Sequence, residues 1–394
     1  MIIDGRLKDG LPETGYDLII IGAGPAGLTL AQELGDTGLR IALLESGGEV
    51  YDDGAQSLNQ GRIEGHDSYD LDTSRLRFLG GTSNHWGGQC TPFDRIDFER
   101  APPGFSGWPM TYDEMVPFWQ RAHRYCDLGA YQYDARALGP DDPQFWQLTD
   151  DRTIEPVVLR QSPPTRFGEK YSASLADSRT IHAWLWTNAV TVSTMPGAER
   201  ETVETRTLDG TERRFQARAV VMAAGAIEST RLVLWSNAKN ATQAGSAGTL
   251  LGRCYMDHLA GGIGTLHFDR HMPDQVQWTP IDTFADEGVP LHFGLHVKED
   301  VQRDLGLTNI IFHALPIADS REKRLRRKRS RDAVDSLANL VKWTIGREMS
   351  ARFRPADAYC EMTMNADDFV VDTVDRVLGP KGAKQALIRF EAEE

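Results

Sequence analysis

The chain has 394 residues, 40% hydrophobic and 25% charged, which is ordinary for a globular protein and long enough for two domains with sizeable cores. The formal net charge is -14, and an acidic surface repels phosphate backbones, so the composition argues against a nucleic-acid partner. No stretch approaches the roughly 18 to 20 apolar residues of a membrane span. The N-terminus lacks a secretory signal and the four cysteines form no C-x-x-C pair, so we expect a cytoplasmic protein without a zinc site.

The first fifty residues have the pattern of a βαβ unit. Tyr16–Ile21 is typical of a short buried strand, Leu28–Gly35 of a helix and Leu39–Leu44 of a second strand. Such a unit implies a parallel sheet with helices on its faces.

Long loops are expected over residues 61–110, which are rich in Gly, Pro, Asp and Ser. Long loops inside compact domains are commonly functional. A helix is predicted over Thr111–Leu128, where Thr111 and Glu114 have the spacing of a capping box.

Strands dominate the pattern over Ile181–Met222, with a hairpin turn predicted at Asp209–Gly210. Ala219–Ala224 is expected to be a further buried strand, and Ala226–Trp235 a helix. A weaker mixture of strands begins near residue 259.

The turn that follows the first strand is rich in glycine, and Gly22, Gly24 and Gly27 fit G-x-G-x-x-G. The first glycine permits a tight turn, the second lets the backbone approach a pyrophosphate, and the third allows close helix–strand packing. The helix then presents free N–H groups to the phosphates. Glu45 ends the next strand, where a carboxylate is placed to accept hydrogen bonds from ribose hydroxyls. This order of elements predicts a dinucleotide site.

A later segment, Ala217–Val233, favours FAD over NAD as the dinucleotide. It is a strand that returns to the same sheet and ends in Ala-Gly, beside the dinucleotide in two-domain flavoproteins. A simple NAD dehydrogenase has no need for it. The alternative for this segment alone is a plain strand–helix unit.

The stretch Arg75–Asp94 has four glycines around His85 and Trp86. Glycines let a backbone approach a flat ligand closely, and the N–H groups of such a loop can bond the N5 atom and carbonyls of a flavin. The imidazole of His85 is nucleophilic enough to attack the 8α-methyl group of FAD and form a covalent tether. The alternative is a hydrogen bond from His85 to a loop carbonyl.

Several segments in order along the chain resemble one family, the glucose–methanol–choline (GMC) oxidoreductases, and in particular its bacterial branch with the pyranose oxidase and the fructose or gluconate dehydrogenase relatives. The segments are IIIGAGPAGLTLAQEL, LLESGG, RLRFLGGTSNHWGG, DFERAPPGFSGWPMTYDEMVPFW, VVMAAGAIESTRLVLWSN, LGRCYMDHL and EMTMNADD.

The resemblance implies a set of FAD-binding residues. They are Gly22, Gly24 and Gly27 at the pyrophosphate with Pro25 and Ala26 beside them, Glu45 with Ser46 at the adenosine ribose, Gly80, Gly81, Thr82, Asn84, His85 and Trp86 around the flavin, Val190 at the adenine through its backbone, and Ala224 and Gly225 on the far side. In pyranose-oxidase-like members the histidine before the tryptophan carries the flavin covalently, and His85 matches that position. A covalent and a non-covalent cofactor both stay open.

The same resemblance implies an α/β fold. We expect a Rossmann-like FAD domain with a β-meander over residues 1–258 and an α+β substrate domain over residues 259–394. It also implies oxidation of a CH–OH group in a sugar, polyol or other alcohol, with electrons passed to oxygen, a quinone or a redox protein. The C-terminal segment that carries the catalytic histidine in the family has no counterpart before Glu394, so we assign no catalytic base and expect a truncated or divergent chain.

Two alternatives remain on the sequence alone. One is a non-catalytic FAD-binding fragment that needs a partner or a missing segment. The other is a different flavin enzyme, such as a desaturase or a hydroxylase, although no second G-x-G-x-x-G unit for NAD(P)H is present.

Overall fold

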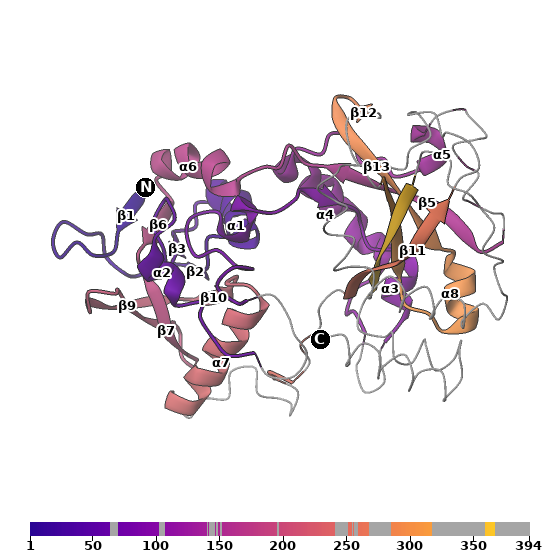
Figure 1. Cartoon of the computed structure of the whole chain (residues 1–394). Coiled ribbons are helices and arrows are strands. Elements are labelled where there is room, and N and C mark those ends of the chain that lie inside the picture. The colour runs from indigo at the N-terminus through magenta and orange to yellow at the C-terminus, as the bar shows by residue number, and fades with distance from the viewer. Residues whose placement is uncertain are drawn as a thin grey trace, which may run out of the picture. The chain divides into compact units, whose positions relative to one another are not determined.

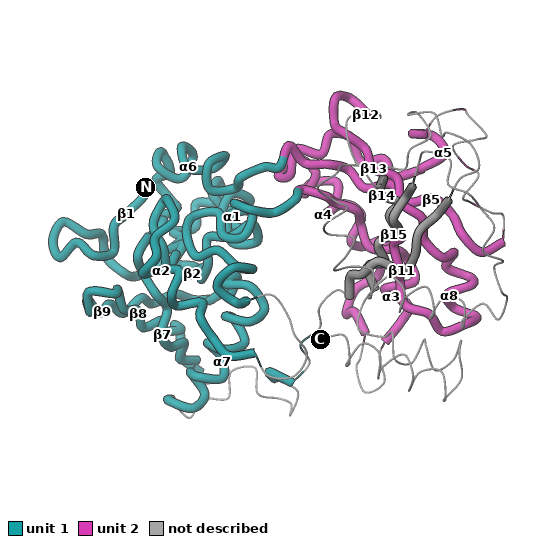
Figure 2. The backbone as a smooth tube through the Cα atoms, in the orientation of Figure 1, with its two compact units in different colours: residues 1–87, 164–255 teal, residues 88–163, 256–394 magenta. Residues whose placement is uncertain are grey.

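The chain forms two compact units, which Figure 2 distinguishes by colour. The computed structural model describes residues 1–63, 70–101, 107–139, 141, 146, 149, 152–194, 197–240, 251–253, 255, 259–267, 285–316 and 359–366. Unit 1 comprises Met1–Gly87 and Pro164–Tyr255, and unit 2 comprises Gly88–Pro163 and Met256–Glu394.

This interleaving differs from the single boundary expected at residue 258. The chain leaves unit 1 for the last time after Tyr255, close to the expected boundary. The earlier segment Gly88–Pro163, however, belongs to unit 2. The reason is strand pairing, because β5 (Ile154–Gln161) runs antiparallel to β13 (Val289–Val297) over seven residue pairs from Leu291↔Arg160 to Val297↔Ile154.

Unit 1 is built on a five-stranded parallel sheet in the order β1-β6-β3-β2-β10 (Figure 1). Its strands are β1 (Ile2–Asp4), β2 (Leu18–Ile21), β3 (Ile41–Leu44), β6 (Ile181–Leu185) and β10 (Ala219–Met222). The four residues of β2 and of β3 are all buried, as expected of central parallel strands covered on both faces. The predicted βαβ unit is therefore confirmed, with α1 (Pro25–Leu34) as its helix and the short η1 (Gly35–Thr37) after it.

The core of this unit lies where the parallel sheet meets a small antiparallel one. β7 (Asn188–Ser193), β8 (Glu201–Arg206) and β9 (Glu212–Ala217) form this three-stranded sheet, with the predicted turn at Asp209–Gly210 between β8 and β9. Trp184 and Phe215, both fully buried, meet edge to face with ring centroids 5.1 Å apart. The remaining helices of unit 1 are α2 (Asp53–Ser57), η2 (Gly81–Asn84), α6 (Phe167–Asp177) and α7 (Ala226–Asn240).

Unit 2 contains a larger antiparallel sheet in the order β11-β15-β14-β13-β5-β4, with β12 paired to β13. The strands other than β5 and β13 are β4 (Gln89–Cys90), β11 (Leu259–His267), β12 (Ala285–Asp286), β14 (Ile310–Pro316) and β15 (Tyr359–Ala366). Its described helices are α3 (Arg95–Glu99), α4 (Tyr112–Cys126), α5 (Ala135–Leu138) and α8 (Glu299–Leu305). The predicted capping box is confirmed, because the Glu114 N–H donates to Thr111 Oγ1 and Glu114 Oε2 accepts from the Thr111 N–H.

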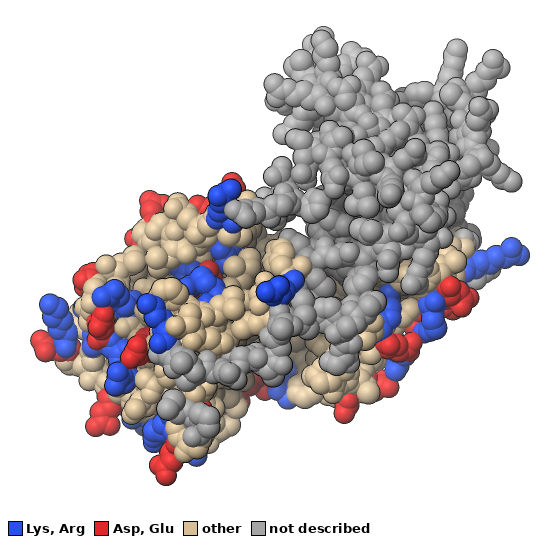
Figure 3. Space-filling view, turned by 90° about the horizontal axis from the view of Figure 1, so that it is seen from below, with Lys and Arg blue, Asp and Glu red and all other residues tan. Residues whose placement is uncertain are grey.

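The surface carries both signs of charge. On the face in Figure 3, basic and acidic side chains are interspersed over the described residues. Over the part of the chain that the structure describes, no helix has both the length and the apolar character needed to cross a bilayer.

Candidate functional site: a dinucleotide cradle

The glycine turn after β2 leads directly into α1, and two of its glycines are required by close backbone contacts. Gly22 has φ +104°, and a Cβ atom there would lie 2.6 Å from the Ala223 carbonyl oxygen. A Cβ atom at Gly27 would lie 1.9 Å from the Gly22 carbonyl oxygen. Only glycine therefore fits these two positions, as the G-x-G-x-x-G pattern predicted.

Gly24 differs from its two neighbours, because a Cβ atom there would meet nothing within 4 Å. It is the N-cap residue of α1 and offers no side chain to cap the helix, so the first-turn N–H groups stay available. Pro25 and Ala26, the first two helical residues, are exposed. The open space and the uncapped helix start together form a cradle for an anion.

Glu45 follows the last residue of β3 and is 6% exposed. Its carboxylate accepts hydrogen bonds from the Ala23 N–H at 2.9 Å and from the Gly47 N–H at 3.0 Å. Burial raises the pKa of Glu45 above its ordinary value, although these backbone hydrogen bonds favour the ionised form. Each oxygen has a lone pair left for a further donor, such as a ribose hydroxyl.

The predicted flavin loop crosses this glycine turn. The Gly80 N–H donates to the Ala23 carbonyl at 2.9 Å, and a Cβ atom at Gly81 would lie 3.0 Å from the Gly24 Cα. Both residues have positive φ, +95° and +53°. The Asn84 side chain stays within the loop and donates to the Leu79 and Gly81 carbonyls. Thr82 is exposed and its hydroxyl accepts a long hydrogen bond from the Leu76 N–H, 3.4 Å.

His85 and Trp86 are adjacent in sequence but have different surroundings. His85 is exposed, and its ring makes no hydrogen bond to any described residue, so the expected alternative of a bond to a loop carbonyl is not seen. The Trp86 indole N–H donates to the Thr165 carbonyl at 2.9 Å, and its ring packs edge to face on Phe167. Trp86 thus anchors the loop, whereas His85 keeps its imidazole available.

The remaining predicted residues lie at the edges of the same cradle. Val190 sits in β7 where the register with β8 shifts between Ala189 and Thr191, and such a bulge leaves the extra residue outside the ladder. This placement suits a backbone contact of the kind expected for Val190. Gly225 is exposed at φ +79°, with nothing within 4 Å of a Cβ atom built on it. Ala224, just before it, lies beside Gly22.

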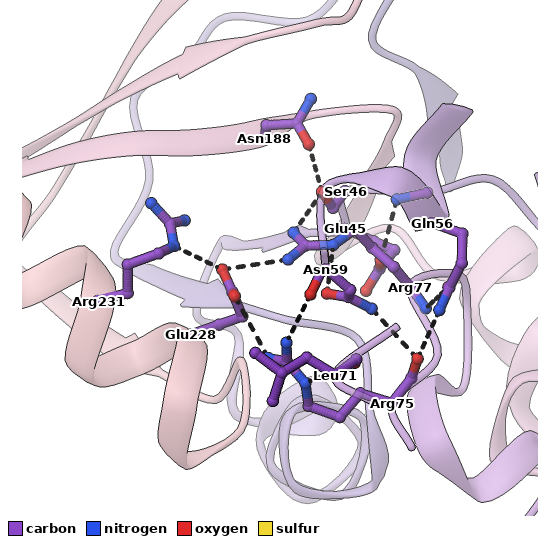
Figure 4. A network of polar contacts seen from close by, with 11 residues as sticks. Glu45, Ser46, Gln56, Asn59, Leu71, Arg75, Arg77, Asn188, Glu228 and Arg231 are labelled. Carbon is purple, nitrogen blue, oxygen red and sulfur yellow. Dashed lines mark hydrogen bonds and ion pairs between the residues drawn. The ribbon is translucent and has the colours of Figure 1, made fainter. Parts of the chain in front are cut away.

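Sequence reasoning missed a polar network beside the cradle, drawn in Figure 4. Ser46 donates its hydroxyl proton to Asn188 Oδ1 and accepts a hydrogen bond from Arg77 Nη1 at 3.0 Å. Arg77 in turn pairs with Glu228 on α7, at 3.1 Å between Nη2 and Oε2. The available signals were Arg77, next to the loop glycines, and Glu228, in the first turn of a predicted helix. Nothing in the sequence indicates that these two residues form a pair.

Unit 2 has a separate polar cluster around the buried His296. His296 on β13 lies 3.1 Å from Glu155 Oε1 through Nε2 and 3.5 Å from Asp94 Oδ2 through Nδ1. Burial alone would lower the pKa of His296, but the two carboxylates raise it to about 9. Within the described parts of the chain, no group of three or more His, Cys, Asp or Glu side chains is arranged to hold a metal ion.

The cradle in unit 1 fits FAD by three features. The helix start at Gly24 offers free N–H groups for a pyrophosphate, and Glu45 offers acceptors for a ribose. The space next to Gly24 and Gly225 is open to an approaching ligand. The cradle lies at the carboxyl ends of β2, β3 and β10, the edge at which parallel α/β sheets bind ligands.

The comparisons with known proteins agree with this cofactor. The family model described as FAD dependent oxidoreductase (DAO) matches residues 17–237. The fructose dehydrogenase large subunit of Gluconobacter japonicus is 24% identical over 353 residues, which cover 68% of this chain and 64% of that subunit. Dehydrogenase str4 of Strobilurus tenacellus is 29% identical over 145 residues, 31% of this chain and 22% of that protein.

Two solved structures are similar at low identity. A fungal aryl-alcohol oxidase has 18% identity and a TM-score of 0.38, with 56% of this chain and 47% of that chain covered. Pyridoxine 4-oxidase from Mesorbium loti has 15% identity and a TM-score of 0.42, with 89% and 71% covered. Both TM-scores are below 0.5, so neither likeness bears on function.

The matched segment starts at Asp17, just before β2, and ends at Asn237 in α7, so it contains the glycine turn, the loop around His85 and the strand that returns beside β2. The predicted α/β fold with a Rossmann-like domain and the predicted FAD cofactor are confirmed. This chain belongs to the FAD-dependent oxidoreductase family.

Proposed function

We propose that this enzyme oxidises a CH–OH group of a sugar, polyol or other alcohol to a carbonyl. The observation that carries the proposal is the cradle itself, with an exposed His85 on the loop that crosses the glycine turn. The relation to a fructose dehydrogenase subunit supports a CH–OH donor, and the chain spans 64% of that subunit.

The residues of unit 1 have distinct parts in this proposal. Bound FAD supplies a hydride acceptor at its flavin N5 atom. The N–H groups at the start of α1 hold the pyrophosphate, and Glu45 accepts from the ribose hydroxyls. Gly80 and Gly81 let the loop backbone lie close to the flavin ring. We also propose that His85 tethers the flavin covalently, since its ring is exposed and bonded to nothing else that the structure describes. The 8α carbon would lose a proton when it bonds the imidazole nitrogen, and the electron acceptor of the enzyme would take up the two electrons left on the flavin.

The proton acceptor for the alcohol hydroxyl stays unassigned. Four histidines with described side chains, His123, His182, His292 and His296, already have polar partners inside the protein. His258 lies outside the described residues. This observation favours a second candidate function, a flavoprotein that holds FAD but needs a partner or a further segment for catalysis.

Anaerobic reduction of the purified, FAD-loaded protein tests these candidates. Bleaching of the flavin absorbance by one member of a panel of sugars, polyols and aromatic alcohols would support the oxidation. A flavin reduced only by NADH or NADPH would contradict it and favour a hydroxylase. A flavin reduced by neither would support the non-catalytic candidate.

Acid precipitation of the same sample tests the tether. Flavin absorbance that stays with the pellet in the wild type and moves to the supernatant in His85→Ala would support it. Flavin released from the wild type would contradict it. The electron acceptor, taken as oxygen, a quinone or a redox protein, and the cytoplasmic location stay predictions from the sequence.

A further inference from the structure

The loop that crosses the cradle is preceded by a segment with little secondary structure of its own. We call residues Arg75–Thr82 the strap. Its backbone makes two hydrogen bonds of 2.9 Å to other backbone groups of the cradle, from the Leu79 N–H to the Gly48 carbonyl and from the Gly80 N–H to the Ala23 carbonyl. The side chains of Gln56 and Asn59 add bonds to the backbone of Arg75 and Arg77. These few bonds offset only part of the conformational entropy of eight residues. The conformation of the strap therefore also depends on its own side chains.

Two arginines supply this side-chain attachment: Arg75, which donates to the Leu71 and Asn59 carbonyls and pairs with Glu228, and Arg77, which alone of the two reaches Ser46. The Nε of Arg77 donates to Asn59 Oδ1 at 2.9 Å, its Nη1 donates to Ser46 Oγ at 3.0 Å, and its Nη2 pairs with Glu228 Oε2 at 3.1 Å (Figure 4). The side chain is 13% exposed, so these contacts are largely shielded from water and salt. A planar guanidinium is suited to three fixed acceptors at once. One side chain thus joins the strap to the residue after Glu45 and to α7.

Glu228 is the common acceptor of three arginines from two elements. Arg75 Nη1 lies 3.3 Å from Oε1, Arg77 Nη2 lies 3.1 Å from Oε2, and Arg231 Nε lies 2.8 Å from Oε2. The carboxylate is 12% exposed and stands in the first turn of α7, where the helix dipole also favours a negative charge. Burial opposes its ionisation, but Arg231 and Arg77 outweigh that effect and lower the pKa of Glu228.

The contact of Arg77 with Ser46 and its ion pair with Glu228 lie at two different parts of the cradle. α7 begins immediately after Gly225, and Ala224 lies beside Gly22. Ser46 follows Glu45 and also bonds Asn188, the first residue of the strand that carries Val190. A movement of Arg77 would therefore release the strap from the ribose end of the cradle and leave Arg75 as its remaining link to α7.

We propose that Arg77 and Glu228 are positioning residues that latch the strap over the cradle, so that the loop of Gly80 and His85 is already formed when FAD arrives. The proposal rests on the FAD site proposed above. Neither side chain is assigned a contact with the reacting atoms. If only a fraction of the unlatched protein has the strap in place, the apparent dissociation constant for FAD rises by the inverse of that fraction.

Arg77→Met tests the latch, and Arg231→Met is its matched control. Both changes remove one guanidinium from the same carboxylate, but Arg231 is 55% exposed, lies on α7 and does not hold the strap. FAD affinity would be measured by quenching of flavin fluorescence on titration into the FAD-free protein, with His85→Ala as the common background so that no covalent tether forms during the titration. We expect at least about tenfold weaker binding for Arg77→Met and less than about twofold for Arg231→Met. Equal losses in the two variants would overturn the proposal.

If Arg77 only stabilised the fold, Arg77→Met would lower the melting temperature of the FAD-free protein and leave the FAD affinity of the folded fraction unchanged. That result would also overturn the proposal. The latch predicts weaker binding with a bound-flavin spectrum that matches the wild type at saturating FAD, because the bound geometry is the same.

Glu228→Gln is the second variant, and it keeps the shape of the side chain if Arg77→Met fails to fold. Its FAD affinity should fall in the same direction, and the double variant with Arg77→Met should lose less than the sum of the two single losses. Fully additive losses would contradict a shared latch. All these titrations omit the alcohol, so a wild type that binds FAD but oxidises no alcohol leaves the latch standing. A wild type that binds no FAD overturns both the site and the latch.

Discussion

The cradle of unit 1 and the His296 cluster of unit 2 differ in whether their polar groups are already paired. In unit 1 the cradle is made of glycines, uncapped N–H groups and an exposed His85 without a partner among the described residues. In unit 2 the polar cluster of His296, Asp94 and Glu155 consists of side chains that pair with one another. A protein that leaves polar groups available next to open space is prepared for a ligand, whereas mutually paired groups stabilise the fold.

The histidines show the difference most directly. His296 lies between two carboxylates, whereas His85 has no carboxylate partner among the described residues. A strongly shifted pKa marks functional sites in many enzymes, yet buried ion pairs shift pKa values as well. In this chain the strongly raised pKa of His296 comes from paired carboxylates inside unit 2, and the candidate for flavin attachment was recognised by its loop.

The largest effect is expected at Gly27, because both the fold and the cradle require a residue without a Cβ atom there. Gly27→Ala places a Cβ atom 1.9 Å from the Gly22 carbonyl oxygen, so the turn or the helix must move. We expect a loss of about 3 kcal/mol in the free energy of unfolding, together with the loss of FAD binding. Urea denaturation and FAD titration measure the two effects. Gly15→Ala, where a Cβ atom meets nothing within 4 Å, is the control and should change neither.

A smaller effect is expected in unit 2, from His296→Gln. Removal of the charged ring leaves Asp94 and Glu155 without their cation, at a cost of about 2 kcal/mol near pH 6. The folded-state pKa of about 9 lies above the ordinary 6.5, so this stabilisation is complete below pH 6.5 and is lost as the pH rises through 9.

Urea denaturation of the wild type and of His296→Gln from pH 6 to pH 10 checks this dependence. The difference in the free energy of unfolding should shrink steadily across that range. His85→Gln in the FAD-free protein is the matched histidine control and should show no such trend, because His85 has no carboxylate partner among the described residues. A constant difference at all pH values would show that His296 is not held as a cation.

The smallest effect on stability is expected for Gly24→Ala, which is compared with Gly27→Ala in the same turn. Gly24 has φ −79° and ψ −173°, which alanine adopts without strain, and its Cβ atom would meet no protein atom within 4 Å. Gly24→Ala should therefore leave the FAD-free protein as stable as the wild type. Its methyl group would enter the space meant for the pyrophosphate, and FAD binding should weaken by about tenfold. Unchanged affinity would place the pyrophosphate elsewhere.

Local patterns predicted the parts of the fold that depend on neighbours in sequence. The βαβ unit, the Thr111–Glu114 capping box and the Asp209–Gly210 turn each lie within a short window and were correct. The glycines of the cradle were found because their spacing reflects a backbone constraint. The elements that were missed include β5 and α6, and β5 takes its place from a distant partner strand, β13.

The grouping of Gly88–Pro163 with unit 2 and the Arg77–Glu228 pair could not be predicted for a related reason. β5 pairs with a strand more than a hundred residues later, and the ion pair joins positions 77 and 228. A single sequence gives the residue types of such partners but not which ones meet. The placement of Val190 at a strand bulge is likewise a property of pairing between β7 and β8.

The position of β10 at the edge of the parallel sheet has a consequence for how the chain is made. β10 pairs with β2, and the turn after it touches Gly22, so the cradle needs residues from both ends of unit 1. A ribosome that adds about 5 to 20 residues per second needs roughly 10 to 45 s to reach Gly225. During that time the glycine turn has been synthesised but β10, which pairs with β2, has not. The segment Gly88–Pro163, which belongs to unit 2, is synthesised between the two. Nascent chains shorter than this should be unable to retain FAD.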